Sequence, residues 1–323
     1  MRYFITGCSG FVGEHIARKV ILEGGTVRAS KRSNSNTLRL KDLEQYIEWV
    51  DINLLDPEAI AIAIKDCNAI IHTAAMVSFD SSKAQSMEEF NVQSTANIVN
   101  VALENNIPLC YVSSIAAVGS SSSNTPINEN QKWEDSAENS AYSISKYHAE
   151  QEVWRGVAEG LKAVILNPSV ILGHGDWQRS SLKIFNYILN EGYYYPQGYF
   201  SYVDVRDVAN LAYRGLTEQK YGERFILNSG SLPYQKVFQT IARYFDVRPP
   251  QKALPIWMGG IAAKLEALRT RIFGGEPKIT KDLIRSSSQK KIYSSQKAIS
   301  TFEYAFYSLE DTMKWVKKNY NNT

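Results

Sequence analysis

One stretch near the start of the chain, Thr6-Gly7-Cys8-Ser9-Gly10-Phe11-Val12-Gly13, decides the fold. Gly7 permits a tight turn after an apolar run, Gly10 lets the backbone approach a pyrophosphate, and Gly13 lets the following helix pack close to a sheet. The N-terminus of that helix then faces the anion. Three glycines alone are weak evidence, but their place between the first predicted strand and a helix favours a dinucleotide site. The residues expected to form its phosphate loop are Gly7, Gly10, Phe11, Val12 and Gly13.

Short apolar runs alternate with helical patterns through the first half of the chain. Strands are predicted at residues 3–6, 26–30, 47–51, 69–73, 109–113 and 163–167, and helices at 12–23, 57–65 and 88–105. Most of the strands are continuously apolar, which is typical of a parallel sheet covered on both faces. The pattern therefore predicts an α/β fold with a doubly wound parallel (Rossmann) sheet and right-handed crossovers.

The length of 323 residues allows about two domains. We expect a nucleotide-binding Rossmann domain at residues 1–167 plus about 201–228. A smaller, mostly helical substrate-binding domain is expected at about 168–200 plus 229–323. Residues 173–200 look irregular, 202–205 look like a short strand and 208–216 like a helix. This arrangement predicts that the chain returns to the main sheet near Tyr202.

Composition and charge exclude several classes of protein. Hydrophobic residues make up 44% and charged residues 21%, which is ordinary for a soluble globular protein. A net charge of +3 does not suggest a nucleic-acid partner. The apolar stretches are too short to cross a bilayer, and the first predicted strand leaves no room for a signal peptide. Three widely spaced cysteines fit a reducing compartment. We therefore expect a cytoplasmic protein without membrane or metal partners.

The end of the second predicted strand indicates which dinucleotide binds. An acid there would accept a hydrogen bond from the ribose 2′-hydroxyl and repel a 2′-phosphate. Residues 27–33 read Val-Arg-Ala-Ser-Lys-Arg-Ser and contain no acid. Cationic side chains can hold a phosphate dianion through charge-assisted hydrogen bonds. NADP(H) is therefore favoured over NAD(H), with the 2′-phosphate expected at Ser30, Lys31, Arg32 and Arg39.

Two further strand ends are expected to contact the cofactor. Asp51 and Ile52 follow the third strand and can meet the adenine edge, although Asp51 can instead cap a helix. Small residues after the fourth strand let the backbone run close to the dinucleotide, and they are Thr73, Ala74 and Ala75. His72, just before them, is expected to pack rather than to react.

A tyrosine and a lysine four residues apart form the candidate catalytic pair. Tyr142 and Lys146 lie on one face of a predicted helix. A free tyrosine has a pKa near 10, and a neighbouring cation lowers that pKa toward the range where proton exchange is feasible. Lys146 can also hold the nicotinamide ribose. Ser114, at the end of an upstream strand, can donate a hydrogen bond to a reacting carbonyl or simply cap the strand.

The sequence resembles an extended short-chain dehydrogenase/reductase of the NAD-dependent epimerase/dehydratase superfamily. The matching segments span roughly residues 1–230 and are TGCSGFVG, IIHTAA, NVQST, YVSSIAAVG, YSISK and SYVDVRDVA. The resemblance implies that Ser114, Tyr142 and Lys146 act together, with Ser113 the less suitable serine. It also implies a supporting role for Asn91 in a proton relay, cofactor contacts from Asn167 and Pro168, and a homodimer.

Three functions remain open. An Asn-Pro-Ser segment at 167–169 and Phe200, where sugar-nucleotide enzymes carry arginines, favour the dihydroflavonol 4-reductase-like branch. Its members reduce ketones or aldehydes with NADPH, and the reverse reaction oxidises the alcohol. The alternatives are a nucleotide-sugar epimerase or dehydratase that retains NAD, and a non-catalytic NADP-binding sensor or structural subunit. Aromatic residues such as Trp177 and Tyr193, together with Ser114, are expected to line a pocket for an uncharged small molecule.

Overall fold

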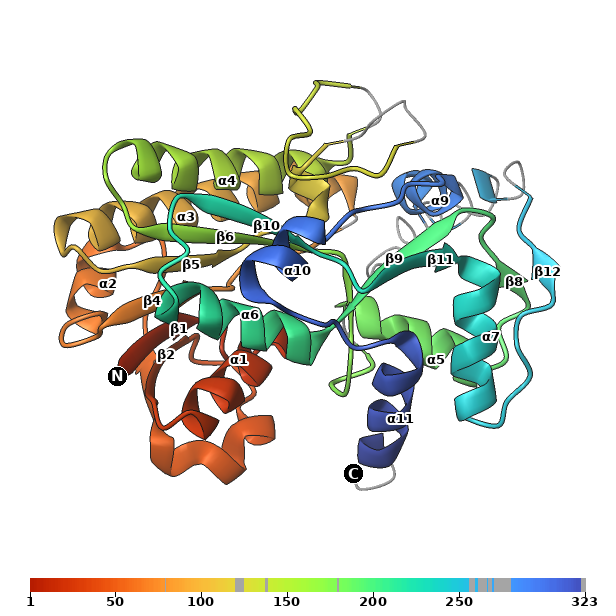
Figure 1. Ribbon diagram of the computed structural model, residues 1–323, viewed down its shortest axis with the longest axis horizontal. Coiled ribbons are helices and arrows are strands. Elements are labelled where there is room, and N and C mark those ends of the chain that lie inside the picture. Colours follow the sequence, from red (N-terminus) through yellow and green to blue (C-terminus); the bar gives the residue numbers. More distant parts are fainter. Residues whose placement is uncertain are drawn as a thin grey trace.

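A seven-stranded parallel sheet forms the centre of the larger part of the molecule (Figure 1). The computed structural model describes residues 1–78, 80–119, 125–136, 139–178, 180–255, 259–260, 266, 269 and 280–320. The sheet order is β10-β6-β5-β4-β1-β2-β3. The strands are β1 (Arg2–Thr6), β2 (Thr26–Lys31), β3 (Ile47–Asp51), β4 (Ala69–His72), β5 (Leu109–Val112), β6 (Ala163–Pro168) and β10 (Glu223–Leu227). The predicted doubly wound parallel sheet is confirmed.

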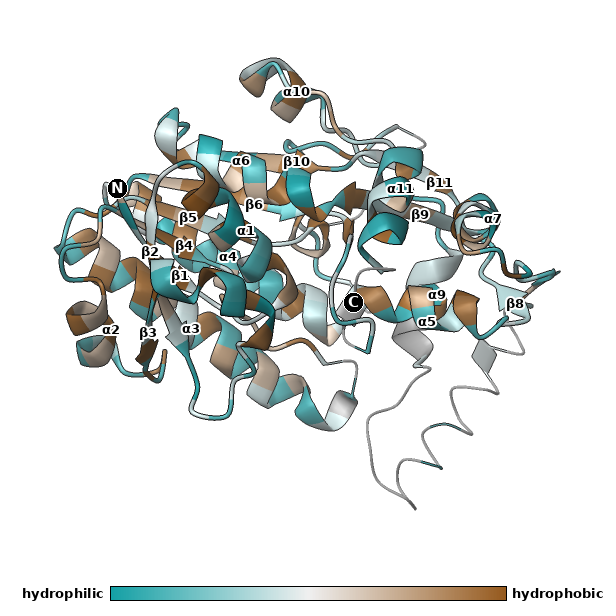
Figure 2. Cartoon of the chain, turned by 90° about the horizontal axis from the view of Figure 1, so that it is seen from below, coloured by the Kyte–Doolittle hydropathy of each residue, from teal (hydrophilic) through white to brown (hydrophobic). Residues whose placement is uncertain are grey.

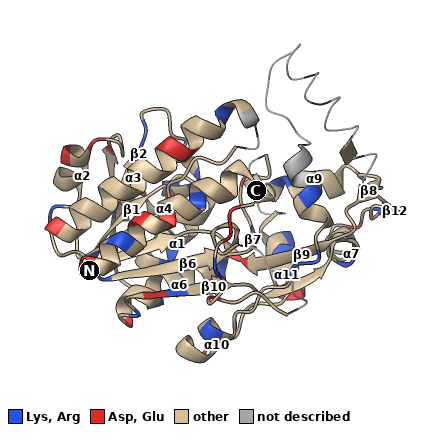
Figure 3. Cartoon of the chain, turned by 90° about the horizontal axis from the view of Figure 1, so that it is seen from above, with Lys and Arg blue, Asp and Glu red and all other residues tan. Residues whose placement is uncertain are grey.

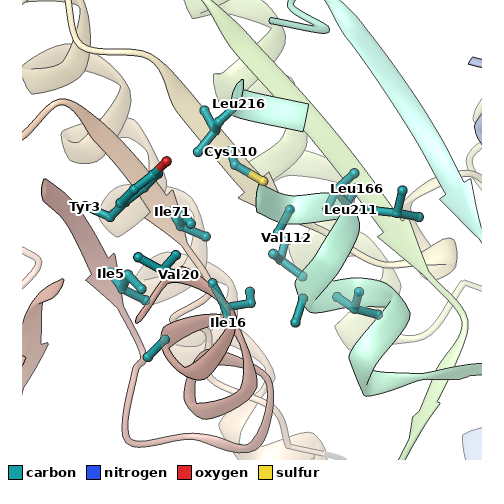
Figure 4. Close-up of a cluster of buried hydrophobic side chains, with 14 of the residues drawn as sticks. Tyr3, Ile5, Ile16, Val20, Ile71, Cys110, Val112, Leu166, Leu211 and Leu216 are labelled. Atoms are coloured by element: carbon teal, nitrogen blue, oxygen red, sulfur yellow. The ribbon is translucent and has the colours of Figure 1, made fainter. Parts of the chain in front are cut away.

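Helices cover both faces of this sheet. One face carries α1 (Phe11–Leu22) and α6 (Val205–Thr217), whose buried residues pack with β1, β4 and β5 in the core drawn in Figure 4. The other face carries α2 (Pro57–Ala63), α3 (Ala84–Glu104) and α4 (Ala141–Ala158). Alternate residues of each strand enter the two cores: Phe4 and Ile70 face α3 and α4, and Ile5 and Ile71 face α1.

A second unit begins directly after β6. Its three-stranded sheet has the order β11-β9-β7, and a two-stranded sheet pairs β12 with β8. These strands are β7 (Val170–Leu172), β8 (Tyr194–Tyr195), β9 (Tyr199–Asp204), β11 (Gly230–Pro233) and β12 (Lys252–Ala253). The helices of this unit are α5 (Lys183–Leu189), α7 (Tyr234–Tyr244), α9 (Lys281–Ser288) and α11 (Leu309–Tyr320). Helix α10 (Gln296–Phe302) lies between α9 and α11 in the sequence but packs on the main sheet. Short 3-10 helices span Leu38–Tyr46, Ser81–Lys83, Ile115–Ala117 and Ser180–Leu182.

Two expectations about the middle of the chain are wrong. The strand around Tyr202 is β9, which pairs with β7 and β11, so the chain does not return to the main sheet there. The return is made by β10, which pairs in parallel with β6 and was not predicted. Residues 173–200 are also less irregular than expected, because α5 and β8 lie within them.

The surface fits the balanced composition. Hydrophobic residues concentrate on the strands and on the inner sides of the helices in Figure 2. Figure 3 shows Lys and Arg interspersed with Asp and Glu along the outer helices. Within the described ranges, no helix is long and apolar enough to cross a membrane.

Candidate active site

The glycine loop connects β1 to α1 with little space between backbone segments. Gly7 has a φ of +70°, and a Cβ atom there would lie 2.7 Å from the Oγ1 of Thr73. A Cβ atom on Gly13 would lie 2.3 Å from the carbonyl oxygen of Gly7. Gly10 is the N-cap of α1, and no side chain caps this helix end. The first backbone N–H groups of α1 therefore remain available for an anion, next to the flanking residues Phe11 and Val12.

The end of β2 carries the cations expected to bind a 2′-phosphate, but they do not form one cluster. Arg32 is exposed, whereas Ser30 is buried and Lys31 is half-buried. Arg39 instead donates from Nε to the Oε2 of Glu14 at 2.6 Å, and the Glu14 carboxylate is almost fully buried. The guanidinium of Arg39 is thus held against α1, while Arg32 at the strand end projects into solvent.

The ends of β3 and β4 bring the next predicted residues to the same sheet edge. Asp51 is exposed, and the backbone N–H of Ile52 donates to Lys31. Asp51 does not cap α2, because Asp56 is the residue whose carboxylate accepts from the first turn of that helix.

Thr73, Ala74 and Ala75 follow β4 and are half-buried. The backbone N–H groups of Thr73 and Ala74 each donate to the Oγ1 of Thr6 at 3.2 Å. These bonds hold the segment beside the glycine loop. A Cβ atom on Gly7 would overlap Thr73 and Ala74, so only glycine allows the loop and this segment to lie so close together at the expected dinucleotide site.

Two adjacent serines after β5 have different partners. Ser113 donates its hydroxyl to the Oε2 of buried Glu150 at 2.6 Å. Ser114 caps the short helix that follows and hydrogen-bonds the side chain of Tyr142. The structure thus places Ser114, rather than Ser113, against the candidate proton donor.

The Tyr142 phenol does not have the lowered pKa that the sequence suggested. Burial raises the pKa of Tyr142, and the hydrogen bond with Ser114 offsets this only in part. The reason is the position of the Lys146 ammonium, whose two hydrogen bonds go to the Oη of Tyr111 at 3.0 Å and to the carbonyl oxygen of Val112 at 3.1 Å. Burial also lowers the pKa of Lys146 to about 8. In this state the tyrosine is a neutral acid.

Tyr111 is a site residue that sequence reasoning missed. It lies on β5, three residues before Ser114, and is 1% exposed. It looked like an ordinary strand residue because nothing in the local pattern places its hydroxyl beside Lys146. The only available signal was its period-2 position, which faces α4 rather than α1.

Asn91 and Asn167 form hydrogen bonds that hold neighbouring segments of the site in place. The side chain of Asn91 accepts from the backbone N–H of Met76 at 2.7 Å and donates to the Oγ of Ser145 at 3.2 Å. Asn167, just before Pro168 at the end of β6, donates to the carbonyl oxygen of Ser114 and to Glu150. The Oδ1 atom of Asn167 is buried without a hydrogen-bond partner.

The two aromatic residues expected to line the pocket lie elsewhere. Trp177 is buried in the core of the second unit, where its ring stacks between Phe185 and Tyr320. Both faces of the indole are therefore covered. Tyr193 is 48% exposed and accepts a hydrogen bond from the backbone of Lys252 on β12. In Figure 1, β12 lies at the end of the molecule far from β1. Aromatic count alone could not separate core rings from pocket rings.

The residues present fit a nicotinamide dinucleotide. The loop has the close backbone approaches that only glycine allows, and the N-terminus of α1 lacks a side-chain cap. Tyr142, Ser114 and Lys146 stand at the carboxyl ends of β5 and on α4, where open parallel sheets bind ligands. The unpartnered Oδ1 of Asn167 lies at the same edge and can accept a hydrogen bond from a bound amide.

Comparisons with known proteins identify the family of the chain. The model of the NAD dependent epimerase/dehydratase family matches residues 3–228. The chain is 29% identical to a protein of Synechocystis named "Putative dihydroflavonol 4-reductase", over 92% of this chain and 88% of that one. It is 28% identical to cinnamoyl-CoA reductase 1 of Petunia hybrida, over 76% and 78% of the two chains.

Among solved structures, the crystal structure of gox2253 has a TM-score of 0.81 and 29% identity, and the match covers 98% of both chains. A nucleoside-diphosphate-sugar epimerase from Pseudomonas aeruginosa has a TM-score of 0.79 at 21% identity, covering 99% of this chain and 98% of that one. The second likeness concerns the fold alone.

Proposed function

The chain belongs to the NAD dependent epimerase/dehydratase family, as an extended short-chain dehydrogenase/reductase, and from this premise we propose that it is an NADPH-dependent reductase of an uncharged ketone or aldehyde. The observation that carries the proposal is the hydrogen-bonded pair of Ser114 and Tyr142, with Lys146 one helical turn further along α4. Two curated relatives that are named as reductases support the reaction class.

The chain's own residues supply the acid–base part of this reaction. When bound, NADPH provides the hydride that adds to the carbonyl carbon. Tyr142 donates its phenolic proton to the carbonyl oxygen, and burial keeps that proton on the phenol until substrate arrives. Ser114 donates a hydrogen bond to the same oxygen as negative charge develops on it. Lys146 stabilises the resulting phenolate, which regains its proton from solvent as the alcohol leaves.

A reductase substrate fits this site better than a sugar nucleotide. Phe200, where the sugar-nucleotide enzymes were expected to carry an arginine, is buried and contacts Tyr234 edge-on. Asn167 occupies the position of the other expected arginine. A diphosphate would lack both cations there, whereas an uncharged carbonyl compound requires none. Assays with ketones, aldehydes and nucleotide sugars separate the two functions, because turnover of a nucleotide sugar with retained NAD would overturn the proposal.

The preference for NADPH rests on the exposed Arg32 at the end of β2. We expect Arg32→Ala to raise the KM for NADPH about 10- to 100-fold, because a charge-assisted hydrogen bond to the 2′-phosphate is worth ~1.5–3 kcal/mol. The KM for NADH should stay unchanged. Lys41→Ala is the control, since it removes an exposed cation from the neighbouring 3-10 helix. Equal changes for both cofactors, or none, would contradict the NADPH assignment.

A further inference from the structure

A buried chain of hydrogen bonds links the end of β1 to Lys146. It starts at Thr6, whose Oγ1 accepts from the backbone N–H groups of Thr73 and Ala74. Since these two bonds occupy the acceptor positions of the hydroxyl, its own hydrogen is directed to the Nδ1 of His72, 2.6 Å away. Nδ1 of His72 is therefore the acceptor nitrogen of that ring.

The next hydrogen bond of the chain runs from His72 to Thr95 on α3. The ring is fully buried, and burial, with the Lys146 charge second, lowers the pKa of His72 to about 3. A neutral imidazole has one N–H, so Nε2 carries the hydrogen and donates to the Oγ1 of Thr95 at 3.2 Å. The Thr95 hydroxyl in turn donates to the backbone carbonyl of Asn91 at 2.7 Å.

Tyr111 joins this chain with only one orientation of its hydroxyl. Its side chain hydrogen-bonds Thr95, and burial raises the pKa of Tyr111, so it stays a neutral phenol. Because the Thr95 hydrogen is committed to Asn91, Tyr111 must be the donor in that bond. A lone pair of the Tyr111 Oη then faces the Nζ of Lys146, at 3.0 Å. The phenol ring also stacks on His72, with 5.6 Å between centroids.

We propose that Tyr111 is a positioning residue, which holds the Lys146 ammonium at the end of β5 through a hydrogen-bond chain that runs in one direction from Thr6. The neutral partners matter here, since an ammonium cannot accept a hydrogen bond and needs oriented acceptors where water is excluded. The backbone carbonyl of Val112 is the second acceptor. The inference rests on the proposed function only for the catalytic use of Lys146, not for its placement.

Other groups near Lys146 do not replace this acceptor. His72 on β4 is neutral, because burial and, second, the Lys146 charge lower its pKa, so the ring adds no second positive charge beside the ammonium. Glu150, one turn further along α4, favours the charged lysine at longer range, but its carboxylate already accepts from Ser113, Asn167 and Arg224. Tyr142, one turn earlier, hydrogen-bonds Ser114. Loss of the Tyr111 hydroxyl therefore leaves the ammonium with one acceptor fewer.

The test measures the titration of Lys146 by NMR in the full chain without added cofactor or substrate. In Tyr111→Phe the stacked ring remains but the acceptor is lost, so we expect the pKa of Lys146 to fall a further 1–2 units, roughly the effect of one hydrogen bond to a charged group. Tyr3→Phe is the matched control, because Tyr3 is another buried strand tyrosine and its hydroxyl hydrogen-bonds Met1 and Tyr213. An unchanged Lys146 pKa in folded Tyr111→Phe would overturn the proposal.

A second variant covers the case in which Tyr111→Phe does not fold. Thr95→Val keeps the shape of the side chain but removes the partner that orients the Tyr111 hydroxyl, so the Lys146 pKa should again fall, by less than in Tyr111→Phe. The ring ¹⁵N shifts of His72 in the unmodified protein should show hydrogen on Nε2, and hydrogen on Nδ1 would contradict the direction of the chain. In a reductase assay, the pH above which activity declines should shift down with the Lys146 pKa. Because the NMR readouts need no turnover, failure of the proposed function leaves them interpretable.

Discussion

At the scale of single residues, two adjacent serines have different hydrogen-bond partners. Ser114 meets Tyr142, whereas Ser113 binds the buried carboxylate of Glu150. The order of residues identified a serine at the right strand end, and the resemblance pointed to Ser114. The contact of Ser113 with Glu150 was not predictable, because it depends on how α4 lies across β5 and β6.

Because their partners differ, we expect substitutions of Ser114 and Ser113 to affect activity and stability differently. Ser114→Ala should lower kcat/KM about 10²–10³-fold, the usual effect of losing one donor to a developing oxyanion, and should lower stability only by the loss of the short helix's cap, about 0.5–2 kcal/mol. Ser113→Ala should instead reduce the free energy of unfolding by about 1–3 kcal/mol, because Glu150 loses a donor in a buried site. Steady-state kinetics and urea denaturation of both variants check this. A reversed pattern would assign the catalytic contact to Ser113.

The pKa of Tyr142 shows where residue spacing misleads. Four residues along a helix place Tyr142 and Lys146 on one face, and this was predictable. The direction in which the ammonium points was not, since it is set by Tyr111 and Val112 on a strand more than thirty residues away. The expectation that Lys146 lowers the pKa of Tyr142 fails in this state for that reason.

At the scale of elements, the fit between the glycine loop and α1 was predictable because it depends on local sterics. Gly13→Ala should both weaken cofactor binding and destabilise the fold by about 1–3 kcal/mol, because the new Cβ would overlap the backbone of Gly7 and Cys8. Cofactor titration and thermal denaturation measure the two effects. Gly260→Ala, where a Cβ meets no atom of the described residues within 4 Å, is the control. Tight NADPH binding by Gly13→Ala would contradict the placement of the pyrophosphate.

Strand prediction succeeded where the apolar runs were long. It failed where the apolar run was short or where the pairing partner determines which sheet the strand joins. The six expected strands of the main sheet all form, with ends shifted by at most one residue. β10 was missed, because Glu223 and Arg224 begin it and leave only three apolar residues. β9 was recognised as a strand but placed in the wrong sheet, because pairing partners cannot be read from a single strand.

At the scale of the whole molecule, Asp207 joins α6 to the chain before α11. Its carboxylate is fully buried and accepts from the Tyr304 hydroxyl at 2.7 Å and from the backbone N–H of Tyr307 at 3.2 Å. Burial raises the pKa of Asp207 to about 7, and nearby Asp204 adds to the rise. The sequence marked the VDVRDVA segment by resemblance but gave no sign of this contact, which spans almost a hundred residues.

Asp207 should make global stability depend on pH. An aspartate with a raised folded pKa stabilises the fold fully below its unfolded pKa of about 4, and the contribution is lost as pH rises through 7. The loss is on the order of 4 kcal/mol at most, from about three pKa units. Asp207→Asn, a neutral isostere, should therefore flatten the decline in unfolding free energy between pH 4 and 8. Equal pH slopes for both proteins in urea denaturation would contradict the assignment.

The central claim is that Tyr142 is the proton donor of an NADPH-dependent carbonyl reductase. The most direct test follows NADPH oxidation with the best ketone or aldehyde from a substrate panel and compares Tyr142→Phe with Tyr147→Phe. Tyr147 is the next tyrosine on α4 and stacks on Trp133 instead of contacting Ser114. Tyr142→Phe should lower kcat about 10²–10⁴-fold, while NADPH still binds and Tyr147→Phe stays near the unmodified rate. Hydride transfer at an undiminished rate in Tyr142→Phe would contradict the claim.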